Sequence, residues 1–138
     1  MDAADTIRAY YDALRAGEPL APFFAAERAG DPQAVKFGIS ERLVGVESIR
    51  EGLRDQTERT VDWAVDSRAL RVTERERHAW FADDVTMGWT DTERGIRYEF
   101  ETRWSGTLER RETADTSPGT PESDWRFVGM HVSTAGEI

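Results

Sequence analysis

The spacing of apolar residues changes from a helical period to a strand period near Thr60, and this change constrains the fold more than any other feature. After Thr60, apolar and polar residues alternate, as they do in strands that bury one face. Before it, one apolar helical face is formed by Ile7, Tyr10, Tyr11 and Leu14. Helices followed by long antiparallel strands predict an α+β domain in which a curved sheet wraps around a helical layer.

Three helices are expected in the first part of the chain. The first ends at Gly17, a short second helix covers residues 20–26, and the third runs from Val46 to about Thr60. Two short strands separate the last two helices, at 35–39 and 42–44.

Longer strands are expected in the second part of the chain. The apolar positions change parity between Val65 and Leu70, which predicts a bulge or bend near 67–69. The remaining elements are two long strands at 78–89 and 96–108, a hairpin loop at 91–95, a mobile loop at 111–123 and a last strand at 124–133.

The length of 138 residues suits one domain, expected to span residues 1–138, whose core can stabilise it without disulfides or metals. The chain has no cysteine, which excludes disulfides, thiolate nucleophiles and cysteine-bearing zinc sites. Its two histidines are few for a metal centre. We therefore expect neither a metal nor a cofactor.

The charge balance is acidic, with a net charge of −9, and Lys36 is the only lysine. Such a surface argues against binding to nucleic acid or to anionic membranes. It resembles the surface of proteins adapted to high salt, although ordinary acidity gives the same pattern. The acidic N-terminal residues do not form a signal pattern, and no stretch approaches the ~18 apolar residues of a membrane span, so a cytoplasmic protein is expected.

Three segments together resemble the SnoaL-like group of the nuclear transport factor 2-like superfamily. They are residues 10–18 (YYDALRAGE), residues 43–50 (LVGVESIR) and the last strand, where WRFV is followed by His131 and Ser133. The resemblance implies a cone-shaped α+β roll of the cystatin-like kind, with three N-terminal helices on a curved, mainly antiparallel sheet. It also implies a pocket between the sheet and the helices, and a homodimer formed through the outer sheet face.

The resemblance implies no single activity, because the superfamily includes isomerases, cyclases, dehydratases, epoxide hydrolases and non-catalytic binders. Tyr10 matches the position of the oxyanion-hole tyrosine of the ketosteroid isomerases. Their general-base aspartate corresponds to Phe37 here, which cannot accept a proton. Isomerisation by that mechanism is therefore not expected.

Polyketide cyclases of this group, as the resemblance implies, carry an acid or base on later strands that face the cavity. Aspartate is disfavoured in strands, so Asp83 and Asp84 either mark the pocket or place one side chain in solvent and the other on a bulge. His131 shares strand parity with Trp125 and Phe127, which predicts an imidazole beside aromatic groups, as a proton carrier or as a core histidine. The catalytic candidates are Tyr10, Asp84 and His131.

Large aromatic residues could line a pocket for a flat apolar ligand, or they could simply fill a small core. The expected pocket residues are Phe24, Phe37, Trp63, Trp80, Tyr98, Phe100 and Trp104. Arg103 either pairs with Glu99 or Glu101, serves the dimer face, or anchors an anion in the cavity.

Three functions remain open. The first is a non-catalytic domain that binds a small apolar ligand in an aromatic pocket. The second is an isomerase, cyclase or hydrolase acting on an apolar carbonyl or epoxide, with Tyr10 as donor and Asp84 or His131 as proton acceptor. The third is an oligomerisation module without a ligand, which would have a filled pocket and a large interface between sheets.

Overall fold

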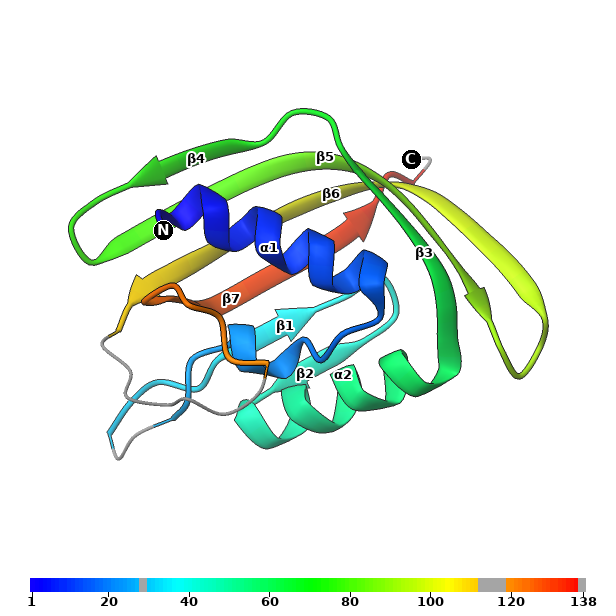
Figure 1. Cartoon of the computed structure of the whole chain (residues 1–138), viewed down its shortest axis with the longest axis horizontal. Coiled ribbons are helices and arrows are strands. Elements are labelled where there is room, and N and C mark those ends of the chain that lie inside the picture. The colour runs from blue at the N-terminus through cyan, green and yellow to red at the C-terminus, as the bar shows by residue number, and fades with distance from the viewer. Residues whose placement is uncertain (28–29, 112–118, 137–138) are drawn as a thin grey trace.

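A computed structural model of the chain describes residues 1–27, 30–111 and 119–136, which form one curved sheet with helices on its concave side (Figure 1). The helical elements are α1 (Ala3–Ala16), the 3₁₀ turn η1 (Ala21–Phe23) and α2 (Val46–Arg59). The strands are β1 (Val35–Phe37), β2 (Arg42–Val44), β3 (Thr60–Ser67), β4 (Arg71–Glu74), β5 (His78–Asp91), β6 (Ile96–Arg110) and β7 (Trp125–Thr134). Across these described residues the fold is α+β, with two α-helices on seven strands.

The sheet is mixed but mostly antiparallel. Its strand order is β2-β1-β7-β6-β5-β3, and β4 pairs with the other end of β5. The exception to the antiparallel pairing is β1, which runs parallel to β7 and places Phe37 opposite His131. As a result, a strand from the first third of the chain lies beside the last strand, and together they form one wall of the roll (Figure 1).

Capping groups fix both ends of α1 and the start of α2. Asp2 and Asp5 form a reciprocal capping box at the start of α1, and Gly17 ends that helix with φ of 70°, a left-handed conformation that glycine adopts at little cost. At the start of α2, the Glu27 carboxylate accepts a 2.8 Å hydrogen bond from the N–H of Val46. The predicted apolar face of α1 is buried against the sheet.

The expected short helix at 20–26 is wrong, and the residues that the structure describes form two α-helices rather than three. Helical geometry there is limited to η1, and the backbone is already extended at Phe24. Phe24 then forms a parallel bridge with Phe127, and the N–H of Ala25 donates to the Phe127 carbonyl at 2.9 Å. Pairing with β7 therefore takes the backbone groups that a longer helix would have used.

A bulge in β7 decides which way His131 points. Phe127 and Gly129 have opposite residues in β6, whereas the intervening Val128 has none. The extra residue reverses the side on which all later side chains lie. His131 is consequently exposed on the outer face, and the expectation that it shares a face with Trp125 is wrong.

The expected bend near 67–69 is confirmed. β3 ends at Ser67 and β4 begins at Arg71, and both strands pair with β5, so the crossing from β3 to β4 lies where the parity of apolar residues changes. Most of the expected loop at 111–123 lies outside the described residues. Within the described part of the chain, no helix combines the length and apolarity that crossing a bilayer requires.

Candidate functional site

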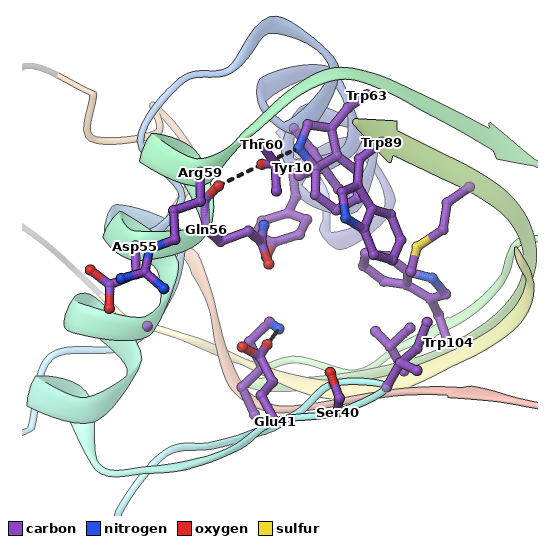
Figure 2. A pocket seen from close by; sticks show the side chains of 17 residues that line it. Tyr10, Ser40, Glu41, Asp55, Gln56, Arg59, Thr60, Trp63, Trp89 and Trp104 are labelled. Carbon is purple, nitrogen blue, oxygen red and sulfur yellow. Dashed lines mark hydrogen bonds and ion pairs between the residues drawn. The ribbon is translucent and has the colours of Figure 1, made fainter. Parts of the chain in front are cut away.

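A cavity of about 440 Å³ lies between α2, the turn from β1 to β2, and the concave face of the sheet (Figure 2). This volume falls in the range typical of pockets for small organic molecules. One wall is aromatic and is formed by residues of β3, β5 and β6. The opposite wall is polar and is formed by residues of β1, the following turn and α2.

Two parallel indoles dominate the aromatic wall. Trp63 stacks on Trp89 with ring centroids 4.9 Å apart and an angle of 21° between the planes. Trp104 and Met87 complete this wall deeper in the cavity. The wall thus offers flat apolar surfaces against which a planar molecule can pack.

A bulge in β3 sets the position of Trp63. The register between β3 and β5 shifts after Val61, and Asp62 in the bulge has φ of 56°, a conformation unusual for a residue with a side chain. The guanidinium of Arg97 donates to the Asp62 carbonyl at 2.5 Å. The indole N–H of Trp63 then donates to the Thr60 hydroxyl at 2.8 Å, so both the backbone and the ring of this segment are fixed.

A buried ion pair lies on the polar wall. The Lys36 side chain points inward from β1, is 5% exposed, and its ammonium donates to the Glu41 carboxylate from the following turn. Gly38 makes this contact feasible, because a Cβ at that position would lie 2.6 Å from Cγ of Glu41. The turn between β1 and β2 is therefore shaped to place a carboxylate over the only lysine of the chain.

Tyr10 brings a third polar group to the cavity from α1. Its ring is 1% exposed and packs edge-on against Phe127 and Phe23, with centroids 5.3 and 5.4 Å away. Burial, and secondly the charge of Glu41, raise the pKa of the Tyr10 hydroxyl, which stays protonated. Among the residues that the structure describes, this hydroxyl has no hydrogen-bond partner, which leaves it available to a ligand.

Helix α2 contributes further polar groups. The Gln56 amide projects from α2 into the space between Glu41 and the Trp63–Trp89 pair, as Figure 2 shows. Asp55 lies on the same helix at the edge of the cavity. Across residues 1–27, 30–111 and 119–136, no three His, Asp or Glu side chains gather as a metal centre would need.

Residues 4–137 of the chain match the SnoaL-like domain family. The chain belongs to this family. The match covers nearly the whole chain and agrees with the roll and its cavity described above. Among curated protein sequences, none matches the chain.

Solved structures share the fold of this SnoaL-like domain. A proposed dehydratase of the nuclear transport factor 2-like family from Streptomyces avermitilis has a TM-score of 0.77 and 13% identity over 97% of this chain and 94% of that chain. A nuclear transport factor 2-like superfamily protein from Salmonella enterica has a TM-score of 0.72 and 16% identity over 96% and 88%. A proposed calcium/calmodulin-dependent protein kinase II association domain from Xanthomonas campestris has a TM-score of 0.70 and 18% identity over 98% and 86%. At such identities the likeness shows the fold alone.

The structure separates the three catalytic candidates of the SnoaL-like domain. Tyr10 lies inside the cavity, whereas Asp84 and His131 line a different hollow of about 360 Å³, together with Arg103. Asp84 is exposed and lies opposite Arg103 in the pairing of β5 with β6, and His131 packs edge-on against Phe37 at 5.9 Å. A mechanism that uses Tyr10 together with either of the other two residues therefore has no geometric support.

Asp83, the residue before Asp84, has a structural role. Asp83 is buried and accepts hydrogen bonds from Tyr11, Ser67 and the backbone N–H of Ala69, at the crossing between β3 and β4. The aspartate pair therefore does not mark the cavity: Asp84 faces solvent, and Asp83 caps an irregular segment. Arg103 contacts the Thr134 carbonyl rather than Glu99 or Glu101.

The expected pocket aromatics fall into three groups in this SnoaL-like domain. Trp63 and Trp104 line the cavity, and Tyr98 and Phe100 continue the concave face beyond it. Phe24 is in the core, and the exposed Phe37 and Trp80 are on the outer face.

Sequence reasoning missed most of the cavity lining, including Trp89, Lys36, Glu41 and Gln56. Trp89 could have been found, because it shares the parity of Phe81 and the other inward residues of its strand. Lys36 gave no such signal, since β1 has three residues and an inward lysine beside an outward Phe37 reverses the usual burial preference.

Proposed function

We propose that this SnoaL-like domain binds a small planar apolar molecule that carries an oxygen function. The observation that carries this proposal is the contrast between the two walls of the cavity. Stacked indoles form one wall, Lys36, Glu41 and Gln56 lie on the other, and the Tyr10 hydroxyl that α1 adds has no acceptor among the described residues.

Two physical arguments support a ligand at this position. The Tyr10 hydroxyl has no partner among the described residues, and a bound oxygen atom or a water molecule would satisfy it. The aromatic rings of a ligand packed against Trp63 and Trp89 would bury their apolar surface away from water, which favours binding. A ligand with a flat body and one polar end satisfies both walls at once.

Quenching of tryptophan fluorescence by naphthol tests the proposal, because the probe is planar and has one hydroxyl group. We expect saturable quenching in the native protein and binding about tenfold weaker in Trp63→Ala, which loses one stacked ring. Trp80→Ala is the matched control, because Trp80 is 47% exposed on the outer face. Equal weakening in both variants, or no saturable quenching, would refute the proposal.

A catalytic function is the second candidate, and one observation favours it. The Glu41 carboxylate acts electrostatically on the Tyr10 hydroxyl, so a donor and a proton acceptor lie near one another in the cavity. In a reaction on an apolar carbonyl or epoxide, Glu41 would be the proton acceptor in place of Asp84 or His131. Turnover of stilbene oxide that is lost in both Tyr10→Phe and Glu41→Gln would support it.

The outer face of the sheet supports a proposal about assembly. Phe37 and Trp80 are large, apolar and exposed there, beside the hollow that contains Asp84 and His131. Exposed apolar groups on one sheet face are typical of interfaces between protein chains. We expect this face to form a homodimer, in which the cavity on the opposite face stays open to a ligand.

A further inference from the structure

We propose that Lys36 and Tyr10 form a two-donor site for the carbonyl oxygen of an uncharged planar ligand, and that Glu41 excludes charged ligands from it. The inference rests on the proposed function, because it names the ligand class of the same cavity. Its evidence lies in the unused donors of these two side chains and in the charge of the polar wall.

Two donors that line the cavity keep unused hydrogen-bonding capacity. An ammonium group has three N–H donors, and within the described residues that of Lys36 donates to Glu41 alone. The Tyr10 hydroxyl is a second donor without an acceptor among those residues. Both side chains are nearly fully buried, and an oxygen atom of a ligand would satisfy the donors that the described residues leave unused.

The charge of the site selects among oxygen functions. Lys36 is already neutralised by the Glu41 carboxylate, and the whole chain has a net charge of −9. A ligand carboxylate would therefore bring a second negative charge next to Glu41, and a ligand ammonium would meet Lys36. An uncharged ketone or quinone oxygen meets both donors without adding charge.

The backbone of the turn between β1 and β2 directs Glu41 onto Lys36, whose charge it neutralises. Without a Cβ at Gly38, the Glu41 side chain folds back onto Lys36 instead of pointing to solvent. The same turn is closed by a 3.0 Å hydrogen bond from the Gly38 N–H to the Glu41 carbonyl. The charge on Lys36 is thus compensated by a residue whose position is fixed by the backbone.

Three probes of matched shape test the inference: acetylnaphthalene, ethylnaphthalene and naphthoate. In the native protein we expect the ketone to bind about tenfold more tightly than the hydrocarbon, as expected for a hydrogen bond from a charged donor, and naphthoate to bind more weakly than the ketone. Lys36→Met keeps the aliphatic stem, and it should abolish the preference for the ketone over ethylnaphthalene.

Glu41→Gln provides a readout that a merely structural role would not give. Removing the carboxylate leaves Lys36 with an uncompensated positive charge, so naphthoate should become the tightest of the three probes. Gly38→Ala displaces the Glu41 side chain without removing its charge, and it should shift the preference in the same direction.

Because the chain has a single lysine, isotope-labelled lysine gives one side-chain signal, which reports on Lys36 in the unmodified protein. Acetylnaphthalene should shift that signal strongly and ethylnaphthalene only weakly. Equal affinity of the ketone and the hydrocarbon in both the native protein and Lys36→Met would overturn the inference, as would naphthoate binding most tightly to the native protein. Failure of all three probes to bind would instead refute the proposed ligand cavity itself.

Discussion

The Tyr11 hydroxyl donates a 2.9 Å hydrogen bond to the Asp83 carboxylate, and this contact joins α1 to the middle of β5. The same carboxylate accepts a 2.6 Å bond from the Ser67 hydroxyl and a 3.0 Å bond from the Ala69 N–H. It is 4% exposed. One buried acceptor thus holds together the helix, the end of β3 and the crossing to β4.

Asp83→Ala is expected to lower the free energy of unfolding by about 3 kcal/mol or more, because the buried Tyr11 hydroxyl and two part-buried donors lose their acceptor. Urea denaturation measures this change. Asp84→Ala is the matched control, since Asp84 is the next residue in the strand but is exposed, and it should change the free energy by less than about 0.5 kcal/mol. Equal losses in both variants would contradict the structural role of Asp83.

Alkaline pH is expected to destabilise the fold. Burial, followed by the charges of Glu41 and Asp83 respectively, raises the pKa of Tyr10 and of Tyr11 above the usual 10.0. Above pH 10 the unfolded chain releases these protons while the folded protein retains them, so stability is full below pH 10 and falls as the pH rises. The slope is at most about 1.4 kcal/mol per pH unit for each group.

Urea midpoints measured on either side of the usual tyrosine pKa test this dependence. Tyr11→Phe removes one of the two groups and should reduce the slope, although it also removes the bond to Asp83 and lowers the stability at every pH. A slope identical to that of the native protein would show that Tyr11 ionises normally in the fold.

The strained residue before Trp63 gives a third prediction. A β-branched side chain at φ of 56° is strongly disfavoured, so Asp62→Val should cost about 1–2 kcal/mol of stability, measured by thermal or urea unfolding. Asp66→Val in the same strand should be neutral or stabilising, because Asp66 is exposed and valine suits a strand. The Asp62 variant should also lose naphthol affinity, since Trp63 would no longer be held against Trp89.

The proposed homodimer gives a fourth. Phe37→Asp places a charge on the outer face and should convert the dimer to a monomer in sedimentation velocity. Ile96→Asp introduces the same change at an exposed apolar residue at the start of β6, and it should leave the dimer intact. A native protein that sediments as a monomer at all concentrations would end this proposal.

Salt is expected to stabilise the protein, because the net charge of −9 makes the folded chain repel itself. The melting temperature should rise between about 0.01 and 0.1 M NaCl, where the Debye length falls from about 30 to about 10 Å. A rise confined to molar salt would point to general salting-out rather than to screening of the acidic surface.

The long elements could be predicted from the sequence because each has a strong repeating pattern. In β6, Tyr98, Phe100 and Trp104 alternate with charged residues, and no other secondary structure satisfies that pattern. The resemblance in three segments identified the family for the same reason. The segment 20–26 was assigned to a helix because its local composition allows one, whereas its backbone bonds are decided by distant β7.

The candidate site was harder to predict because it depends on single-residue irregularities. The bulge at Val128 moved His131 to the outer face, and the bulge at Asp62 turned Trp63 toward Trp89. Neither has a compositional signature that distinguishes it from an ordinary strand residue. The polar wall was missed because Lys36 is buried against the usual preference of lysine, and such exceptions are expected at functional sites.

The parallel pairing of β1 with β7 also governs when the cavity can exist during protein synthesis. The ribosome must add almost a hundred further residues after β1 before β7 is available, because Val35 pairs with Gly129 and Phe37 with His131. Until then, the nascent β1 and β2 have no sheet to join, and the Trp63–Trp89 pair has no opposite wall. The proposed ligand binding would therefore require β7, and a premature stop codon before residue 125 would remove it even where α1 and the β5–β6 hairpin still form.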